Sequence, residues 1–191
     1  MGIRWYTRGL SVEWSDSFIE SRRVTLANRI TIFRLILIPV FNVLVVSYTP
    51  DKPLFRYLAL LVFVLAALSD ALDGFIARAY NQKTRLGAVL DPLADKLLLN
   101  LAFVFLAVND KFIEHPPLWV PVLILSRDVI IVMGSYLLNE LYGPLRVRPR
   151  ISGKLTTALQ MASIVAVLLQ ASFTYELLVV MMVVTVFSFF D

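Results

Sequence analysis

The stretch DALDGFIARAYNQKTRLGAVLDPLAD, residues 70–95, decides how this chain folds and what it can do. It carries four aspartates and two glycines, and a strongly apolar segment borders it on each side. Of the chain's 191 residues, 59% are hydrophobic, whereas soluble domains usually contain about 45–50% apolar residues. The composition therefore indicates one domain that is solvated mainly by lipid, with a group of carboxylates set into it.

Apolar segments near the ~20-residue length that crosses a bilayer occur six times along the chain. We expect membrane-spanning helices at about residues 31–49, 54–79, 84–108, 117–141, 153–171 and 174–190. The predicted fold class is an all-α integral membrane protein, built as a bundle of six transmembrane helices with an N-terminal interfacial amphipathic helix.

The N-terminal segment is the part that we expect to lie on the membrane and not to cross it. Leu10, Trp14 and Phe18 recur every four residues, and Arg22 and Arg23 follow them. This pattern favours an amphipathic helix on anionic lipid, with a solvated leader as the alternative. We therefore divide the chain into a cytoplasmic interfacial segment, residues 1–27, and a membrane domain, residues 28–191.

The lysines and arginines are distributed unevenly between the two ends of the predicted spans. Most of them lie before the first span and around the turns that follow the second and fourth spans. The positive-inside rule then places both termini, and residues 70–95, on the cytoplasmic side of a bacterial-type inner membrane. Anionic lipid of the inner leaflet is a sufficient partner for these cations, so no nucleic-acid partner is expected.

Two residue types narrow the possible chemistry. The chain has no cysteine, which excludes disulfides, thiolate metal sites and cysteine nucleophiles. Its one histidine, His115, stands in the polar turn KFIEHPP, where we expect a loop residue and not a catalytic base. The remaining metal ligands are therefore oxygen atoms.

The four aspartates can converge if the chain turns back on itself near residues 81–85. Asp70 and Asp73 share a helix face, and so do Asp91 and Asp95, because residues three or four apart are neighbours on a helix. Carboxylates that are crowded in a low-dielectric site must take up protons or bind cations. Oxygen ligands favour hard ions such as Mg²⁺, Mn²⁺ or Ca²⁺, and two divalent ions match four carboxylates in charge. Two-metal sites of this kind serve phosphoryl chemistry; the alternative is that the aspartates cap helices or pair with nearby cations.

The spacing of this stretch resembles the signature of the CDP-alcohol phosphotransferase family. All eight specified positions match in Asp70-x2-Asp73-Gly74-x2-Ala77-Arg78-x8-Gly87-x3-Asp91-x3-Asp95. The resemblance extends over nearly the whole chain from Asn28. It implies a six-helix membrane bundle, commonly a homodimer, and an enzyme that moves a phosphoalcohol from a CDP-linked donor to an acceptor hydroxyl and releases CMP.

The resemblance also implies roles for individual residues. Two divalent ions, Mg²⁺ or Mn²⁺, would be held by Asp70, Asp73, Asp91 and Asp95, and Asp95 would also act as the general base. The CDP part of CDP-diacylglycerol would be bound by Asn28, Thr31, Asp70, Gly74, Ala77, Arg78 and Gly87. Among these, Arg78 would meet the diphosphate, and the small residues would make room for the nucleotide.

The acceptor is expected to be an anionic glycerol-type alcohol. Its phosphate would be bound by Arg127, Arg148, Arg150 and Lys154, with Arg127 facing the cavity and paired with Asp128. The GKLTT and LGAVLDPLADKLL segments resemble the branch of the family that uses glycerol 3-phosphate, although Ser135 stands where that branch usually has a second arginine. The SRD triplet and the RPRISGK run are similar to the branch that makes cardiolipin from phosphatidylglycerol, which is our alternative.

Other classes of membrane protein also use intramembrane carboxylates. A cation or proton transporter is the more distant alternative, but a transport pathway predicts acids through the whole membrane depth. An intramembrane prenyltransferase would need a second Asp-rich motif far away in the sequence. A bundle without catalytic activity would leave Arg78 and the two glycines unexplained.

Overall fold

The computed structural model describes the backbone of residues 26–79, 85–143 and 151–190. Within these ranges it describes the side chains of 31–69, 93–143 and 152–189, except Tyr136 and Tyr142. In this part of the chain there are six α-helices, α2 (Leu26–Ser47), α3 (Leu54–Ala79), α4 (Arg85–Val108), α5 (Trp119–Tyr142), α6 (Ile151–Leu169) and α7 (Thr174–Phe190).

Each predicted span coincides with one of these helices, so the all-helical prediction is confirmed. The largest difference is at α2, which begins at Leu26 and not near residue 31. Asn28 and Thr31 are therefore helical positions, and the predicted segment boundary between residues 27 and 28 falls inside α2. The predicted interfacial helix lies, except for its last two residues, outside the described residues.

Only part of the six-span prediction meets a test of length and composition. Among the described residues, the segments Trp119–Leu141 and Ser152–Leu169 are long and apolar enough to cross a membrane. Shorter apolar helical segments cover Thr31–Ser47, Leu54–Ser69 and Thr174–Phe189. The count of six spans, and the direction in which they cross, remain predictions.

The exposed surface of α5 has the apolar character that helices show when lipid surrounds them. Val122, Val132, Met133 and Leu141 are each more than half exposed on this helix. In water, a contiguous apolar surface of this kind would favour association or aggregation. Lipid tails solvate the same side chains without cost, so this surface is consistent with a membrane environment.

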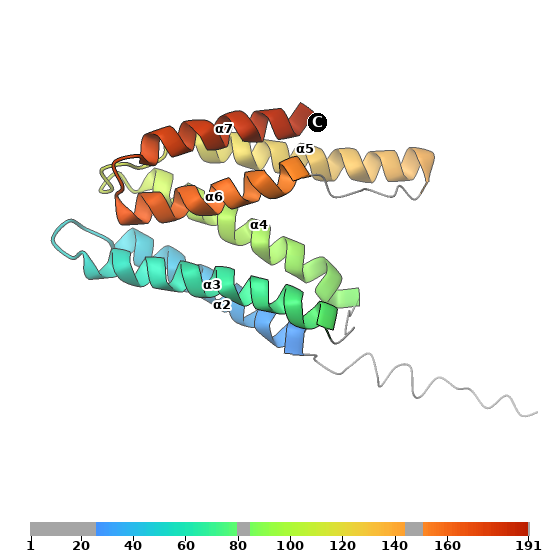
Figure 1. The fold of residues 1–191 in the computed structure, drawn as a ribbon, viewed down its shortest axis with the longest axis horizontal. Coiled ribbons are helices and arrows are strands. Elements are labelled where there is room, and N and C mark those ends of the chain that lie inside the picture. The colour runs from blue at the N-terminus through green and yellow to red at the C-terminus, as the bar shows by residue number, and fades with distance from the viewer. Residues whose placement is uncertain (1–25, 80–84, 144–150, 191) are drawn as a thin grey trace, which may run out of the picture.

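The helices pack as two groups, α2 to α4 and α5 to α7, which meet where α3 contacts α6 and where α4 contacts α5 and α6. α2 lies along both α3 and α4, and α6 lies along α7 (Figure 1). α4 also contacts α5 and α6, so it is central to the bundle. In Figure 1 the second half of α5 extends past the ends of α6 and α7. α3 and α4 run in opposite directions, and α4 begins six residues after α3 ends, so the chain reverses its direction between them.

Small and aromatic side chains together explain the close contact of α2, α3 and α4. Ala59, Ala66 and Ala102 are fully buried, and small residues let helix backbones approach closely. The rings of Phe41 and Phe63 fill the space beside them, with centroids 5.7 Å apart. This core fixes α2 against the two helices that carry the acidic stretch.

Polar contacts tie the helices together at the end of the bundle that is remote from residues 70–95. The Asn109 side chain donates a hydrogen bond to the carbonyl of Val45 at 2.7 Å. Gln170 donates one to the hydroxyl of Tyr48 at 2.9 Å, and the Tyr48 ring packs on Phe112. This end is therefore held by specific bonds that are independent of the acidic stretch.

Candidate active site

The acidic signature is divided between the C-terminal turns of α3 and the N-terminal half of α4. Asp70, Asp73 and Arg78 belong to the last turns of α3, and Asp91 and Asp95 to the first half of α4. The connection between Ala79 and Arg85 spans six Cα steps, which at 3.8 Å each limits the two helix ends to about 23 Å apart at most. The fold thus brings the two halves of the signature to the same end of the bundle.

Of the four predicted metal ligands, Asp95 is the one whose side chain is described. The described side chains include no group of three or more acidic, His or Cys residues that could hold a metal. Asp70, Asp73 and Asp91 are placed by their helices alone, so the predicted metal cluster stays a prediction. The same holds for Asn28, Gly74, Ala77, Arg78 and Gly87.

Asp95 on α4 forms an ion pair with Arg34 on α2. The Arg34 side chain is fully buried, whereas the Asp95 side chain is 31% exposed. A buried guanidinium needs an anionic partner, because desolvating an uncompensated charge costs several kcal/mol. On α4, Ala94, Leu98 and Leu99 are buried, whereas Leu93 and Leu97 are exposed. Asp95 is a partly accessible carboxylate at the edge of this apolar contact.

Thr31 lies one turn before Arg34 and is also fully buried. The spacing of three puts both residues on the same face of α2, which packs toward α4. Asn28 precedes Thr31 by the same interval. Asn28 and Thr31, which were predicted to bind the donor, therefore lie on the helix whose Arg34 pairs with Asp95, a pairing that the sequence did not indicate.

A second polar group joins α4, α5 and α7. Asp128 on α5 accepts from the Lys96 ammonium at 2.6 Å and from the Arg127 guanidinium at 3.1 Å. Arg127 also donates to the Ser188 hydroxyl on α7 at 3.0 Å. The predicted pairing of Arg127 with Asp128 is confirmed. The roles of Lys96 and Ser188 were not predicted. For Lys96, its position one residue after Asp95 in an apolar helix could have indicated that it needs an anionic partner.

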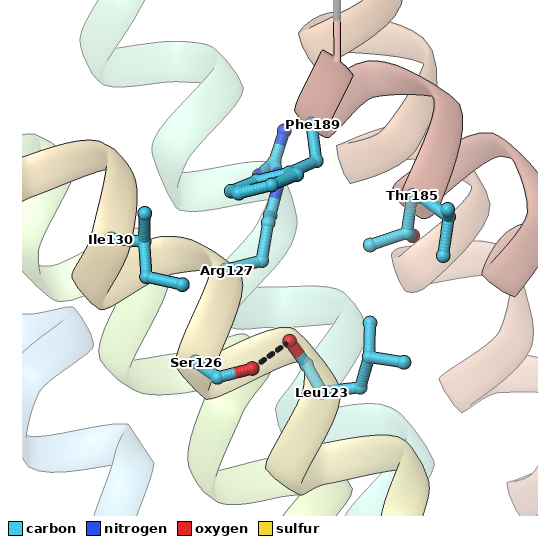
Figure 2. A pocket seen from close by; sticks show the side chains of 7 residues that line it. Leu123, Ser126, Arg127, Ile130, Thr185 and Phe189 are labelled. Atoms are coloured by element: carbon cyan, nitrogen blue, oxygen red, sulfur yellow. Dashed lines mark hydrogen bonds between the residues drawn. The ribbon is translucent and has the colours of Figure 1, made fainter. Parts of the chain in front are cut away.

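Arg127 borders a pocket of about 230 Å³ between α5 and α7 (Figure 2). Its wall is mainly apolar and is formed by Leu123, Ser126, Arg127, Ile130, Thr185, Val186 and Phe189. The two hydroxyls in the wall donate to backbone carbonyls of their own helices, Ser126 to Leu123 at 2.9 Å and Thr185 to Met181 at 2.7 Å. Arg127 is therefore the charged side chain of a pocket that otherwise suits an apolar ligand.

The remaining predicted acceptor residues are less fully defined. Arg148 and Arg150 fall in residues 144–150, outside the described residues. Lys154 is exposed on the first turn of α6. Further along this helix, Thr156, Gln160 and Ser163 are buried at spacings of four and three, which makes a polar face inside the bundle that sequence reasoning missed. Alternation of these polar residues with apolar ones was the available signal.

The sequence of this chain matches a known protein family. A sequence model of the CDP-alcohol phosphatidyltransferase family matches residues 24–189. This match covers most of the chain, including α2 to α7 almost completely. The chain belongs to the CDP-alcohol phosphatidyltransferase family.

Its relatives carry two names. It is 33% identical to human cardiolipin synthase (CMP-forming) over 167 residues, which cover 79% of this chain and 52% of the relative. It is 41% identical over 106 residues to the CDP-diacylglycerol–glycerol-3-phosphate 3-phosphatidyltransferase of Rickettsia bellii, covering 56% of this chain and 55% of the relative. The Escherichia coli K12 protein with the same name is 37% identical over 142 residues, 71% of each chain. The chain spans about half the length of the first two of these relatives.

Proposed function

We propose that this member of the CDP-alcohol phosphatidyltransferase family transfers the phosphatidyl group of CDP-diacylglycerol to glycerol 3-phosphate and releases CMP. The observation that carries the proposal is the position of the eight-residue signature. Its two halves stand at the same end of the bundle, on helices that both pack against α2. The names of the bacterial relatives support glycerol 3-phosphate as the acceptor.

Two divalent ions, Mg²⁺ or Mn²⁺, fit the donor set of this site. The ligands would be the carboxylates of Asp70, Asp73, Asp91 and Asp95; the described member of the set, Asp95, is partly accessible. Hard divalent cations prefer such oxygen donors. When bound, they would neutralise the diphosphate and stabilise the charge that develops on the departing nucleotide.

Residues of α2, α3 and the start of α4 would bind the donor. Arg78 would pair with the diphosphate, because a guanidinium makes charge-assisted hydrogen bonds to phosphate oxygens. Gly74, Ala77 and Gly87 would leave room for the nucleotide beside the helix backbones. Asn28 and Thr31 would approach it from α2, the helix whose Arg34 holds Asp95.

Asp95 would be the general base of the transfer. It would take the proton from the acceptor hydroxyl, whose oxygen would form a bond to the lipid-side phosphorus of the diphosphate. The bond from that phosphorus to the bridging oxygen would break, and CMP would leave with the bridging oxygen. Arg34 keeps the Asp95 carboxylate at the contact of α2 and α4, so the base would have a fixed position.

Arg127, Arg148, Arg150 and Lys154 would bind the phosphate of the acceptor. Asp128 already offsets part of the charge of Arg127, so the loop arginines and Lys154 would supply much of the attraction. We further expect a homodimer in an inner membrane, with both termini and the active site on the cytoplasmic side. Family membership favours this transferase over a cation or proton transporter.

Cardiolipin synthesis, with phosphatidylglycerol as the acceptor, is the second candidate. The human relative with that name aligns with 79% of this chain. The pocket beside Arg127 is mainly apolar, which suits an acceptor that carries acyl chains better than a small polyol phosphate.

The test is a set of parallel assays on the purified protein in liposomes that contain CDP-diacylglycerol. Glycerol 3-phosphate, phosphatidylglycerol, inositol phosphate and serine are offered separately, and CMP and the lipid products are measured. Phosphatidylglycerophosphate supports the first proposal, and cardiolipin supports the second. If the protein releases no CMP with any of the four acceptors, both proposals are overturned.

A further inference from the structure

Two consecutive residues of α4 form ion pairs with two different helices. Asp95 pairs with Arg34 on α2, and Lys96 pairs with Asp128 on α5 at 2.6 Å. Successive residues point about 100° apart around a helix axis. The two ion pairs therefore hold α4 from two directions, and together they restrict its rotation about its own axis.

Asp128 is the shared acceptor on the α5 side. One oxygen of its carboxylate receives Lys96 and Arg127, and the other lies 3.5 Å from the Asn100 side-chain amide of α4, at the limit of a hydrogen bond. The Asp128 side chain is 13% exposed. Lys96 and Asn100 are four residues apart, so Asp128 contacts two successive turns of the same face of α4.

Apolar packing does little to fix α5 at this level of the bundle. The buried apolar residues that α5 contributes to the described core are Val120 and Ile124, both near its start. Val129 and Ile130, which follow Asp128, are each 52% exposed. The polar contacts of Asp128 are therefore the specific connection between α5 and the middle of α4.

We propose that Asp128 is a positioning residue of the active site: by holding Lys96 it sets the rotation of α4, and with it the orientation of the face that carries Asp91 and Asp95. The proposal rests on the proposed function, because it assigns those two aspartates to the site. Asp128 itself acts through Lys96 and need not touch the substrate or the reacting atoms.

The kinetic test compares Asp128→Asn with a matched control elsewhere in the fold. Asp128→Asn removes the charge and keeps the size of the side chain. We expect turnover to fall about 10–100-fold, and the Mg²⁺ concentration for half-maximal activity to rise about tenfold, as for loss of a group that orients a ligand. Gln170→Leu removes the bond to Tyr48 at the remote end; it should lower thermal stability and leave the Mg²⁺ requirement unchanged.

A second measurement detects the rotation of α4 without relying on activity. The chain contains no cysteine, so Leu93→Cys and Val129→Cys give two unique sites for spin labels on exposed positions of α4 and α5. We expect Asp128→Asn to shift or broaden the distance distribution between the labels. Gln170→Leu in the same background should leave it unchanged, and Asp128→Glu, which retains the charge, should restore much of the wild-type distribution.

The outcomes separate the inference from the function on which it rests. An unchanged distance distribution and Mg²⁺ requirement in Asp128→Asn, with only a loss of stability like that of Gln170→Leu, would overturn the positioning role. If Asp128→Asn does not fold, Lys96→Met tests the same contact from α4 with the same two measurements. A wild-type protein that releases no CMP would refute the proposed function, and the label distances would still decide whether Asp128 fixes α4.

Discussion

The guanidinium of Arg34 on α2 and the carboxylate of Asp95 on α4, 61 residues apart in sequence, form an ion pair inside the helix bundle. Arg34 is fully buried, and Asp95 is partly accessible. The pair joins α2, one turn after Thr31, to the last position of the acidic signature. It explains why an arginine stands in the apolar run ITIFRLILI, where a charge without a partner would be strongly unfavourable.

Removing one member of this pair should cost more stability than removing both. Asp95→Leu leaves the fully buried Arg34 guanidinium without this carboxylate, and we expect about 3–5 kcal/mol of destabilisation, as for other broken buried pairs. The double variant Arg34→Leu with Asp95→Leu should recover a large part of that loss, because apolar residues then pack in place of two charges. Thermal unfolding in detergent measures the stability of the single and the double variant. Equal losses in the single and double variants would mean that the pair does not carry the stability assigned to it.

Asp95→Asn should abolish most turnover and leave nucleotide binding largely intact. The amide cannot take the proton from the acceptor hydroxyl, and general-base help is worth about 10²–10⁴-fold. CMP formation and equilibrium binding of CDP should be measured on the same preparation. Asp110→Asn, in the exposed turn after α4, is the control and should be neutral. Wild-type turnover in Asp95→Asn would show that another group is the base.

Arg127→Gln should weaken use of the acceptor more than use of the donor. A hydrogen bond to a charged group contributes about 1.5–3 kcal/mol, so the acceptor KM should rise roughly 10–150-fold while the KM for CDP-diacylglycerol stays the same. The control is Arg56→Gln, which removes one arginine at the end of α3 that is remote from the acidic signature. A change confined to the donor KM would place Arg127 in the donor site instead.

Divalent ions should be required for activity, and both acidic helices should contribute to holding them. Equilibrium dialysis with Mn²⁺ in the presence of CDP should give two ions per wild-type chain. Asp73→Asn on α3 and Asp91→Asn on α4 should each reduce that number or raise the dissociation constant. Full Mn²⁺ binding by both variants would show that the two helices do not share a metal site.

The sequence predicted most of what depends on local patterns. Apolar run lengths located α3 to α7 closely, because the helices end where polar turn residues begin. The start of α2 was placed too late, since LANRI is helical in spite of its polar residues. Pairing of Arg127 with Asp128 was predictable because the two are adjacent in sequence.

Contacts between distant residues were not predictable in the same way. The apolar run around Arg34 indicated that its charge needed a partner, and any of several aspartates could have supplied one. Only the packing of α2 on α4 selects Asp95. In the sequence, Lys96 is one of several charges near the signature. Only the contact of α4 with α5 shows that its partner is Asp128.

The most direct measurement of the central claim is the ratio of CMP to phosphatidylglycerophosphate formed by the purified protein in liposomes with CDP-diacylglycerol, glycerol 3-phosphate and Mg²⁺. We predict one CMP for each lipid product, and loss of both products together in Asp95→Asn. Formation of the lipid product without CMP, or of no product under any of these conditions, would contradict the claim that the protein transfers the phosphatidyl group to glycerol 3-phosphate.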